Sequence, residues 1–344
     1  MTPIDGAEIA PDQFSARSAK IEWPPHPVSQ KDTMAHPPSR LDDLVTLAAK
    51  APTVIAAIAH PCDAGAIQAA VEAARLGFIT PILVGPEHKI TAAAQAAGVD
   101  ISGLQIVSAP HSHASAAEAV RLVRAGEAEI LVKGSLHTDE LMAEVVNTQT
   151  GLRTERRVSH VFVIDLASYP RLLLITDAAV NITPTLEDKR DIVQNAIDLA
   201  HAIGVARPKV AIVSAIETVT SKLPSTLEAA ALCKMADRGQ ITGGDLEGPL
   251  AFDNAVSPEA AKDKGIDGDV AGHADIILVP DLESGNMLAK QLTFLGGAES
   301  AGVVLGARVP IALTSRADSV EAKVASLALA ALLADHRRRQ ASVA

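Results

Sequence analysis

A regular alternation of apolar runs and helix-like segments begins at Thr53, and it limits how this chain can fold more than any other feature does. TVIAAIAH (53–60) is rich in β-branched residues, AGAIQAAVEAARLG (64–77) has apolar residues at helical spacing, and FITPILVG (78–85) is apolar again. Continuous apolar strands separated by amphipathic helices indicate a mainly parallel sheet covered on both faces. The chain is therefore predicted to have an α/β fold.

The alternation continues along most of the chain. Further apolar runs suited to strands occur at 103–109, 128–134, 160–166, 171–180, 209–215, 274–281, 301–306 and 309–315. Helices are expected at 87–97, 112–126, 185–204, 225–237, 284–296 and 318–334. Thr185 and Asp188 form a capping signal at the start of one helix, and Gly204 marks its end. Residues 1–38 lack periodicity and are predicted to be a flexible extension.

Charge and composition exclude several classes of function. The net charge of −11 argues against nucleic acid or an anionic membrane as a partner, because both would be repelled. No apolar stretch of about 18 residues and no basic leader occurs, so a soluble, unexported protein is expected. Cys62 and Cys233 have no CxxC spacing, which suits a reducing cytosol.

Several standard motifs for cofactors, metals and nucleophiles are absent. The chain has neither a GxGxxG after a strand nor a GxxxxGK[ST] loop, and GxSxG, HExxH and paired CxxC are also missing. The sequence therefore predicts no metal and no bound nucleotide cofactor.

Polar residues follow two of the predicted strands. KGSLHTDEL (133–141) places Lys133, Ser135 and His137 where a strand turns into a helix; alternatively, Ser135 or Thr138 only caps that helix and His137 lies on the surface. HPCD (60–63) also follows a predicted strand, and we interpret its Cys62 as structural. The neighbouring Asp63 would oppose its thiolate and suits an N-cap better.

The segment PIALTSRADSVEAK (310–323) sets Ser315 and Arg316 where a strand gives way to the last helix. A helix start has unpaired backbone N–H groups, so a serine and a guanidinium there would complete an anion site. Under the alternative interpretation, Ser315 or Asp318 caps the helix and Arg316 is solvated.

A long glycine-rich stretch, ITGGDLEGPLAFDNAVS (241–257), is expected to be an irregular loop. It carries four polar residues of interest: Asp245, Glu247, Asp253 and Asn254. Three interpretations are open: convergent ligands for Mg²⁺, solvated carboxylates, or the lid or wall of an active site.

Taken together, five segments resemble the phosphate acetyl/butyryltransferase family. They are LVKGSLHTDELM, TDAAVNITPTLEDKRDIVQNAIDLA, RGQITGGDLEGPLAFDNAVS, ADIILVPDLESGNMLAKQL and VPIALTSRADS, and they span about residues 128–320. The resemblance implies a homodimer of two α/β domains with a cleft between them, an architecture like that of isocitrate and isopropylmalate dehydrogenases. On this chain the domains would be 39–150 plus 303–344, and 151–302.

The family resemblance also implies an activity: transfer of an acyl group between coenzyme A, as a substrate, and inorganic phosphate. The serine-arginine pair of its active site falls on Ser315 and Arg316, with the arginine on phosphate. The acetyl branch has a proposed aspartate base where this chain has Ala322, so Asp318 or Glu321 substitutes, or no base is needed. This departure, and a missing arginine after the GSLH segment, look more like the butyryl branch.

The predicted site therefore joins catalytic and substrate-binding residues across a cleft. We predict catalytic roles for Ser315, Arg316 and Asp318, and a substrate-binding role for Lys133, Ser135, His137, Asp253 and Asn254. In this hypothesis the 241–257 loop and the 133–138 turn face Ser315 and Arg316. Two other functions stay open: a decarboxylating dehydrogenase on the same architecture, and a non-catalytic sensor of CoA or acyl phosphate.

Overall fold

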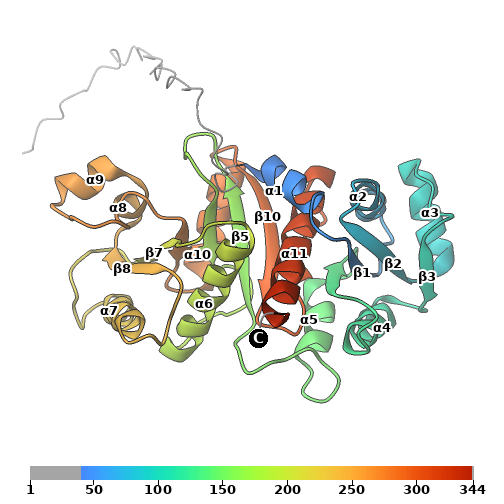
Figure 1. Cartoon of the computed structure of the whole chain (residues 1–344), viewed down its shortest axis with the longest axis horizontal. Coiled ribbons are helices and arrows are strands. Elements are labelled where there is room, and N and C mark those ends of the chain that lie inside the picture. Colours follow the sequence, from blue (N-terminus) through green and yellow to red (C-terminus); the bar gives the residue numbers. More distant parts are fainter. Residues whose placement is uncertain (1–39, 343–344) are drawn as a thin grey trace, which may run out of the picture. The chain divides into compact units, whose positions relative to one another are not determined.

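The computed structural model describes residues 40–342 (Figure 1), and the predicted extension 1–38 lies outside them. Within these residues, eleven strands form one sheet in the order β3-β2-β1-β4-β11-β10-β5-β6-β9-β7-β8. The strands are β1 (Val54–Ala59), β2 (Ile79–Gly85), β3 (Gln105–Ser108), β4 (Ile130–Lys133), β5 (Ser159–Asp165), β6 (Leu173–Thr176), β7 (Lys209–Val213), β8 (Asp245–Leu250), β9 (Ile276–Leu278), β10 (Glu299–Leu305) and β11 (Ile311–Ala312).

The helices cover both faces of this sheet. They are α1 (Leu41–Ala48), α2 (Ala64–Arg75), α3 (Glu87–Ala97), α4 (Ser112–Arg124), α5 (Thr138–Val146), α6 (Leu186–Ala202), α7 (Pro224–Asp237), α8 (Phe252–Val256), α9 (Pro258–Asp263), α10 (Leu282–Phe294) and α11 (Val320–Ala341). The largest apolar core packs α1, α2, α3, α6, α7 and α11 on one face. On the other face, one cluster lies under α4 and α5 and another under α8, α9 and α10.

The direction of the strands reverses at the middle of the sheet. β10 is antiparallel to both β11 and β5, and β5 is antiparallel to β6, whereas the other neighbouring strands are parallel. The carboxyl ends of β1, β4 and β11 therefore meet at one edge of the sheet. Those of β6, β9, β7 and β8 lie at the opposite edge.

Helix α11 crosses the middle of the molecule, next to α2 and α6 (Figure 1). It is 22 residues long, and its residues from Lys323 to Asp335 are buried on all sides of the helix. A helix that is apolar all round belongs in a core, and this one is packed by α1 and α2 as well as by the sheet.

Most of the predicted elements are confirmed, and two expectations are corrected. The last helix, expected over about 318–334, continues through its basic end to Ala341, where Arg338 forms an ion pair with Glu129. The 241–257 stretch is not an irregular loop, since its middle forms β8 and α8. Helices α1 and α9 were not predicted. The division into two domains stays a prediction.

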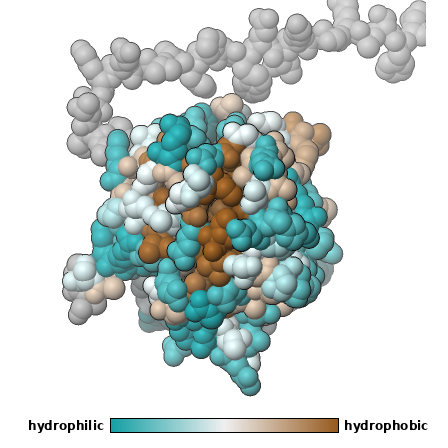
Figure 2. Space-filling view, turned by 90° about the vertical axis from the view of Figure 1, so that its right-hand side faces the viewer, coloured by the Kyte–Doolittle hydropathy of each residue, from teal (hydrophilic) through white to brown (hydrophobic). Residues whose placement is uncertain are grey.

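The end of the sheet formed by β3 is an open edge. Strand β3 pairs only with β2, and its four residues are at most half-buried. Figure 2 views the molecule from this side, where a hydrophobic stripe crosses a face that is otherwise largely hydrophilic.

A close backbone approach ties the turn after β4 to the turn after β1. Gly134 N donates to Ala59 O (2.9 Å), and Ser135 N donates to His60 O (2.9 Å). A Cβ on Gly134 would lie 2.5 Å from Ala59 O and 2.6 Å from His60 O, which are backbone atoms that cannot rotate away. Glycine is therefore required where these two turns meet.

We expect Gly134→Ala to lower the free energy of unfolding by about 2 kcal/mol, because the added methyl group overpacks this contact. Urea unfolding followed by circular dichroism would measure the change. Gly103→Ala is the matched control, since a Cβ there meets nothing within 4 Å. Equal midpoints for the two variants would contradict the argument.

Candidate active site

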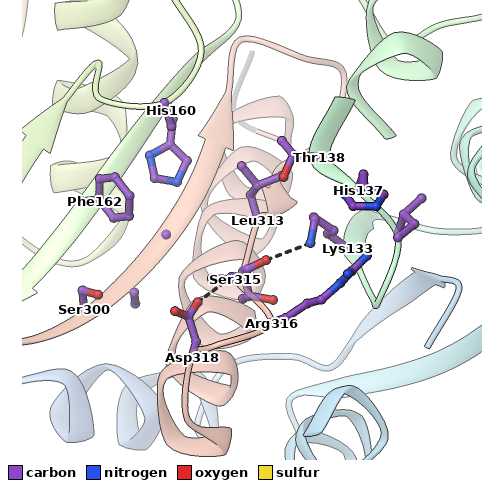
Figure 3. A pocket seen from close by; sticks show the side chains of 15 residues that line it. Lys133, His137, Thr138, His160, Phe162, Ser300, Leu313, Ser315, Arg316 and Asp318 are labelled. Carbon is purple, nitrogen blue, oxygen red and sulfur yellow. Dashed lines mark hydrogen bonds between the residues drawn. The ribbon is translucent and has the colours of Figure 1, made fainter. Parts of the chain in front are cut away.

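A cavity of about 370 Å³ lies beside the middle strands β5 and β10. The turn before α5, strands β5 and β10, and the segment between β11 and α11 form its walls (Figure 3). Its lining includes Lys133, Leu136, His137, Thr138, His160, Phe162, Ala179, Ser300, Ala301, Gly302, Leu313, Thr314, Ser315, Arg316 and Asp318.

Ser315 and Asp318 form a small turn of their own before the last helix. Ser315 N donates to Asp318 Oδ2 (2.6 Å), and Ala317 N donates to Ser315 Oγ (3.3 Å). The helix cap is a different residue, Ser319, whose Oγ accepts from Ala322 N (3.1 Å). The alternative in which Ser315 or Asp318 caps the helix is therefore wrong.

Arg316 reaches from this turn to the turn after β4. Its Nε donates to the backbone carbonyl of Ser135 (3.0 Å), and no carboxylate of residues 40–342 forms an ion pair with it. The guanidinium is exposed to the cavity, so its remaining donors are open to an anion.

Lys133 is buried at the end of β4, with only 5 % of its surface exposed. Its Nζ donates to Thr314 O (3.0 Å) and to Gly134 O (3.4 Å), and no ion pair with a carboxylate is present among the described residues. Burial lowers the pKa of Lys133 and the positive charge of Arg316 lowers it further, while the charges of Asp318 and Asp63 act in the opposite direction. Two cations thus share one cavity, and neither forms an ion pair with a described carboxylate.

Ser135 joins two turns, and His137 rather than Ser135 or Thr138 is the cap of α5. Ser135 Oγ donates to His60 O (2.8 Å) and accepts from Cys62 N (3.1 Å), so it joins the turns after β1 and β4. The N-cap of α5 is His137, whose N donates to Glu140 Oε2 (2.9 Å). Neither Ser135 nor Thr138 is the cap, and His137 is exposed at the rim of the cavity.

The structure does not bring Asp253 and Asn254 to this cavity. They follow β8, the last strand at the far end of the sheet, whose carboxyl end points to the opposite edge from those of β4 and β11. Asp253 is exposed, while Asn254 is buried and donates through Nδ2 to Glu217. Of the two walls predicted opposite Ser315, only the 133–138 turn lines the cavity.

The carboxylates of the 241–257 stretch do not converge either. Asp245 forms an ion pair with Arg207, and Glu247 Oε2 accepts from Ala271 N (3.1 Å). No group of three or more potential metal ligands occurs in residues 40–342. The Mg²⁺ interpretation of this stretch therefore has no support in the geometry.

Two further expectations can be compared with the structure. Asp63 Oδ1 accepts from Ala66 N (2.8 Å) as the N-cap of α2, as predicted, and burial raises the pKa of the Cys62 thiol to about 11. Asp318 and Glu321 are the two acids expected to substitute for the family's aspartate, which this chain lacks at Ala322. Asp318 lines the cavity, whereas Glu321 faces a separate groove beside α1 and α2.

The sequence reasoning missed the wall of the cavity formed by β5 and β10. This wall is lined by His160, Phe162 and Gly302, with Leu313 of the segment after β11 beside them. It brings an imidazole into a largely apolar surface. The available signal was a histidine at the start of the apolar run HVFVIDL, where a strand buried on both faces has no need of a polar side chain.

Two cations without an ion-pair partner among residues 40–342 lie beside a serine near the ends of strands in an α/β sheet, an arrangement typical of sites that bind anionic ligands. Comparison with known proteins agrees. A family model described as "Phosphate acetyl/butaryl transferase" matches residues 111–331. A phosphate acetyltransferase from Rhizobium meliloti is 62 % identical over 307 residues, covering 89 % of this chain and 97 % of that protein.

Two further proteins support the same assignment. A phosphate butyryltransferase from Clostridium acetobutylicum is 44 % identical over 281 residues, covering 82 % of this chain and 93 % of that protein. The crystal structure of a branched-chain phosphotransacylase from Enterococcus faecalis V583 has a TM-score of 0.72 and 32 % identity, covering 82 % of this chain and 99 % of that chain. The chain therefore belongs to the phosphate acetyl/butyryltransferase family.

Membership of this family confirms the predicted α/β fold class and the predicted enzyme class, an acyltransferase. Relatives of both names match, so the closer likeness to the butyryl branch stays a prediction. In the part of the chain that the structure describes, no helix is both long enough and apolar enough to cross a membrane.

The lowered pKa of Lys133 gives the site a defined pH dependence. We expect Lys133→Met to weaken phosphate binding at neutral pH by about tenfold or more, because one charge-assisted hydrogen bond is lost. The difference in affinity between the wild type and the variant should shrink as pH rises, because Lys133 loses its proton. Since the pKa of Lys133 is lowered, the difference should already be gone at a pH below the ordinary pKa of lysine. Isothermal titration calorimetry with phosphate measures both, and exposed Lys290→Met is the control.

A difference that persists unchanged to high pH would contradict this assignment. It would mean that Lys133 either keeps an ordinary pKa or affects phosphate through packing alone.

Proposed function

We propose that this protein catalyses the reversible transfer of a short acyl group between coenzyme A and inorganic phosphate, in the cavity beside β5 and β10. The observation that carries the proposal is the pair Lys133 and Arg316, two cations that face one cavity beside Ser315 and have no described carboxylate as an ion-pair partner. Such a pair suits phosphate, because a guanidinium offers a bidentate fork and an ammonium adds charge.

The chemistry asks little covalent work of the protein. A phosphate oxygen attacks the thioester carbon, a C–O bond forms, the C–S bond breaks, and coenzyme A leaves as a thiolate. The positive charges of Arg316 and Lys133 compensate the negative charge of phosphate, and the two side chains orient it toward the thioester. Ser315 supplies a hydroxyl beside them for the carbonyl oxygen or the sulfur. No step requires an acyl-enzyme intermediate.

Asp318 is the carboxylate beside the serine, and we assign it a positioning role. It accepts from Ser315 N and so fixes the turn that carries the hydroxyl and the guanidinium. Phosphate is already an anion near neutral pH, so its attack needs no general base, and an alanine at 322 is compatible with turnover.

The acyl group is acetyl or butyryl in this proposal. The names of the relatives support both, and they favour acyl transfer over a dehydrogenase on the same architecture. Release of CoA from acetyl-, propionyl- and butyryl-CoA, with and without phosphate, separates the possibilities. Phosphate-dependent release supports the proposal, and its relative rates give the chain length. Binding of CoA without any release would instead indicate a sensor.

We also propose a cytoplasmic homodimer of two α/β domains, 39–150 plus 303–344 and 151–302, as the family resemblance implies. The two thiols support a reducing compartment, because burial raises the pKa of both Cys62 and Cys233 to about 11 and no disulfide joins them. Large apolar side chains at the end of α10 support self-association: Phe294 is 78 % exposed and Leu295 is 83 % exposed.

Sedimentation equilibrium tests the dimer. The wild type should sediment at twice the chain mass of 35.6 kDa, and Phe294→Asp should shift the protein toward the monomer, because a charge would be buried at the interface. Val146→Asp, which also replaces an exposed apolar side chain by a charged one but on α5, is the control. A wild type that stays monomeric at high concentration would rule the proposal out.

Arg316 should be essential for turnover. We expect Arg316→Ala to lower kcat/KM for phosphate-dependent CoA release by about 100-fold or more, as for loss of one donor to the transition state. Arg75→Ala, which removes an exposed arginine paired with Glu72 on α2, should leave the rate unchanged. Steady-state assays with free thiol detection measure both variants, and circular dichroism confirms their fold. Near-normal kinetics in a folded Arg316→Ala protein would remove Arg316 from the site.

A further inference from the structure

A buried imidazole faces the cavity from strand β5. His160 is 1 % exposed, and its Nδ1 is a buried polar atom with no hydrogen-bond partner among the described residues. A buried polar atom left without a partner is destabilising, and such atoms are uncommon in folded proteins. A phenylalanine would fill the same space without this penalty, so packing alone does not account for histidine here.

The ring is held in one position by its neighbours. Phe162, two residues along the strand, packs edge to face against it, with ring centroids 4.3 Å apart and an interplanar angle of 67°. On β10, a Cβ at Gly302 would lie 2.7 Å from His160 Nε2 and 3.1 Å from the carbonyl oxygen of Leu313. The imidazole therefore occupies the space that a side chain at Gly302 would need.

The two ring nitrogens have different surroundings. Nδ1 is buried without a partner, whereas Nε2 lies over Gly302, which lines the cavity. A bare lone pair is tolerated in such a buried position better than an orphaned N–H, so the proton belongs on Nε2. Burial lowers the pKa of His160 to about 3, so the ring is neutral in the physiological range.

The position of this donor relative to the phosphate site follows from the strand register. Leu313, whose carbonyl lies beside the Gly302 position, is two residues before Ser315, a distance of about 7 Å in extended chain. Ser315 and Arg316 thus mark one end of the cavity and His160 the other (Figure 3). The end near His160 is largely apolar, since Phe162, Ala301 and Leu313 line it, with Ser300 as a further polar residue on β10.

We propose that His160 is a further catalytic residue, whose neutral Nε2–H donates a hydrogen bond to the thioester carbonyl oxygen of acyl-CoA. The inference rests on the proposed function. As phosphate attacks, the carbonyl oxygen gains negative charge, and this donor strengthens its bond in the transition state. No proton is transferred: the C–O bond forms, the C–S bond breaks, and the imidazole returns unchanged.

The two ends of the cavity have different roles in this proposal, and a neutral group suits the end near His160. Phosphate is bound by cations at the Arg316 end, and a second positive group beside the acyl chain would attract it to the wrong place. An uncharged donor in apolar surroundings instead favours the charge that develops only during the reaction.

Two variants test the role of the imidazole in CoA release. We expect His160→Phe to lower kcat by about 100-fold with little change in KM for phosphate, because a transition-state donor is lost while the ring packing is kept. His160→Gln, which restores an N–H donor, should recover at least part of that loss. His88→Phe makes the same change at an exposed position on α3 and should leave kcat unchanged.

A third variant keeps the histidine and moves it. Gly302→Ala places a methyl group 2.7 Å from Nε2, so it should displace the ring and lower kcat toward the His160→Phe value. In addition, ¹⁵N spectra of histidine-labelled protein should show His160, assigned by its absence in His160→Phe, protonated on Nε2 and not titrating from about pH 5 to about pH 9.

The outcomes separate this inference from the function it rests on. If the wild type releases no CoA in a phosphate-dependent way, the proposed function fails and the inference fails with it. If the wild type is active, a folded His160→Phe with normal kcat, or a ring protonated on Nδ1, overturns the inference alone.

Discussion

The reversal of strand direction across β10 and β5 is the constraint on which the rest of the structure depends. Because β10 is antiparallel to both neighbours and β5 is also antiparallel to β6, the sheet joins two parallel sets that point in opposite directions. Within one set, β4 and β11 are parallel neighbours, so their carboxyl ends lie side by side and bring Lys133 next to the turn of Ser315 and Arg316. The cavity forms beside this turn, over residues of β5 and β10.

Buried positive charge lies in and beside this cavity. Lys133 and Lys323 are both buried, with 5 % and 6 % of their surfaces exposed, and both donate to backbone carbonyls of the segment between β11 and α11. Carbonyl oxygens satisfy the N–H donors, and Asp318 and Asp63 offset part of the charge of Lys133 without forming an ion pair with it. Under the proposed function, phosphate would add counter-charge here, so binding and local stability would be linked.

The sequence was informative wherever function depended on local pattern. Continuous apolar runs identified most of the strands, and Lys133, Ser315 and Arg316 could be found because each lies at or shortly after the end of an apolar run. Asp253 and Asn254 could not be placed, because local periodicity contains no information on strand order or direction. Strand β8 was read as a loop because its residues, DLEGPL, have low strand propensity and pair on one side only.

His160 was missed for the opposite reason. It lies in an apolar strand whose pattern indicates core. Its ring gains a place beside the cavity only through the pairing with β10, where His160 pairs with Val304 and its ring lies over Gly302, more than a hundred residues away in sequence. Contacts of this range are set by topology rather than by propensity. The catalytic assignments that rest on them therefore needed the three-dimensional structure.

The position of β11 and α11 has a consequence for how the molecule is assembled. These two elements follow all the others in the described chain, yet β11 lies between β4 and β10, and α11 is packed by elements from both ends of the sequence. The two halves of the sheet are therefore joined through the segment that comes last among the described residues, since β11 is the strand that pairs with both β4 and β10. The same segment leads into Ser315 and Arg316, so closing the sheet and completing the lining of the cavity are one structural event.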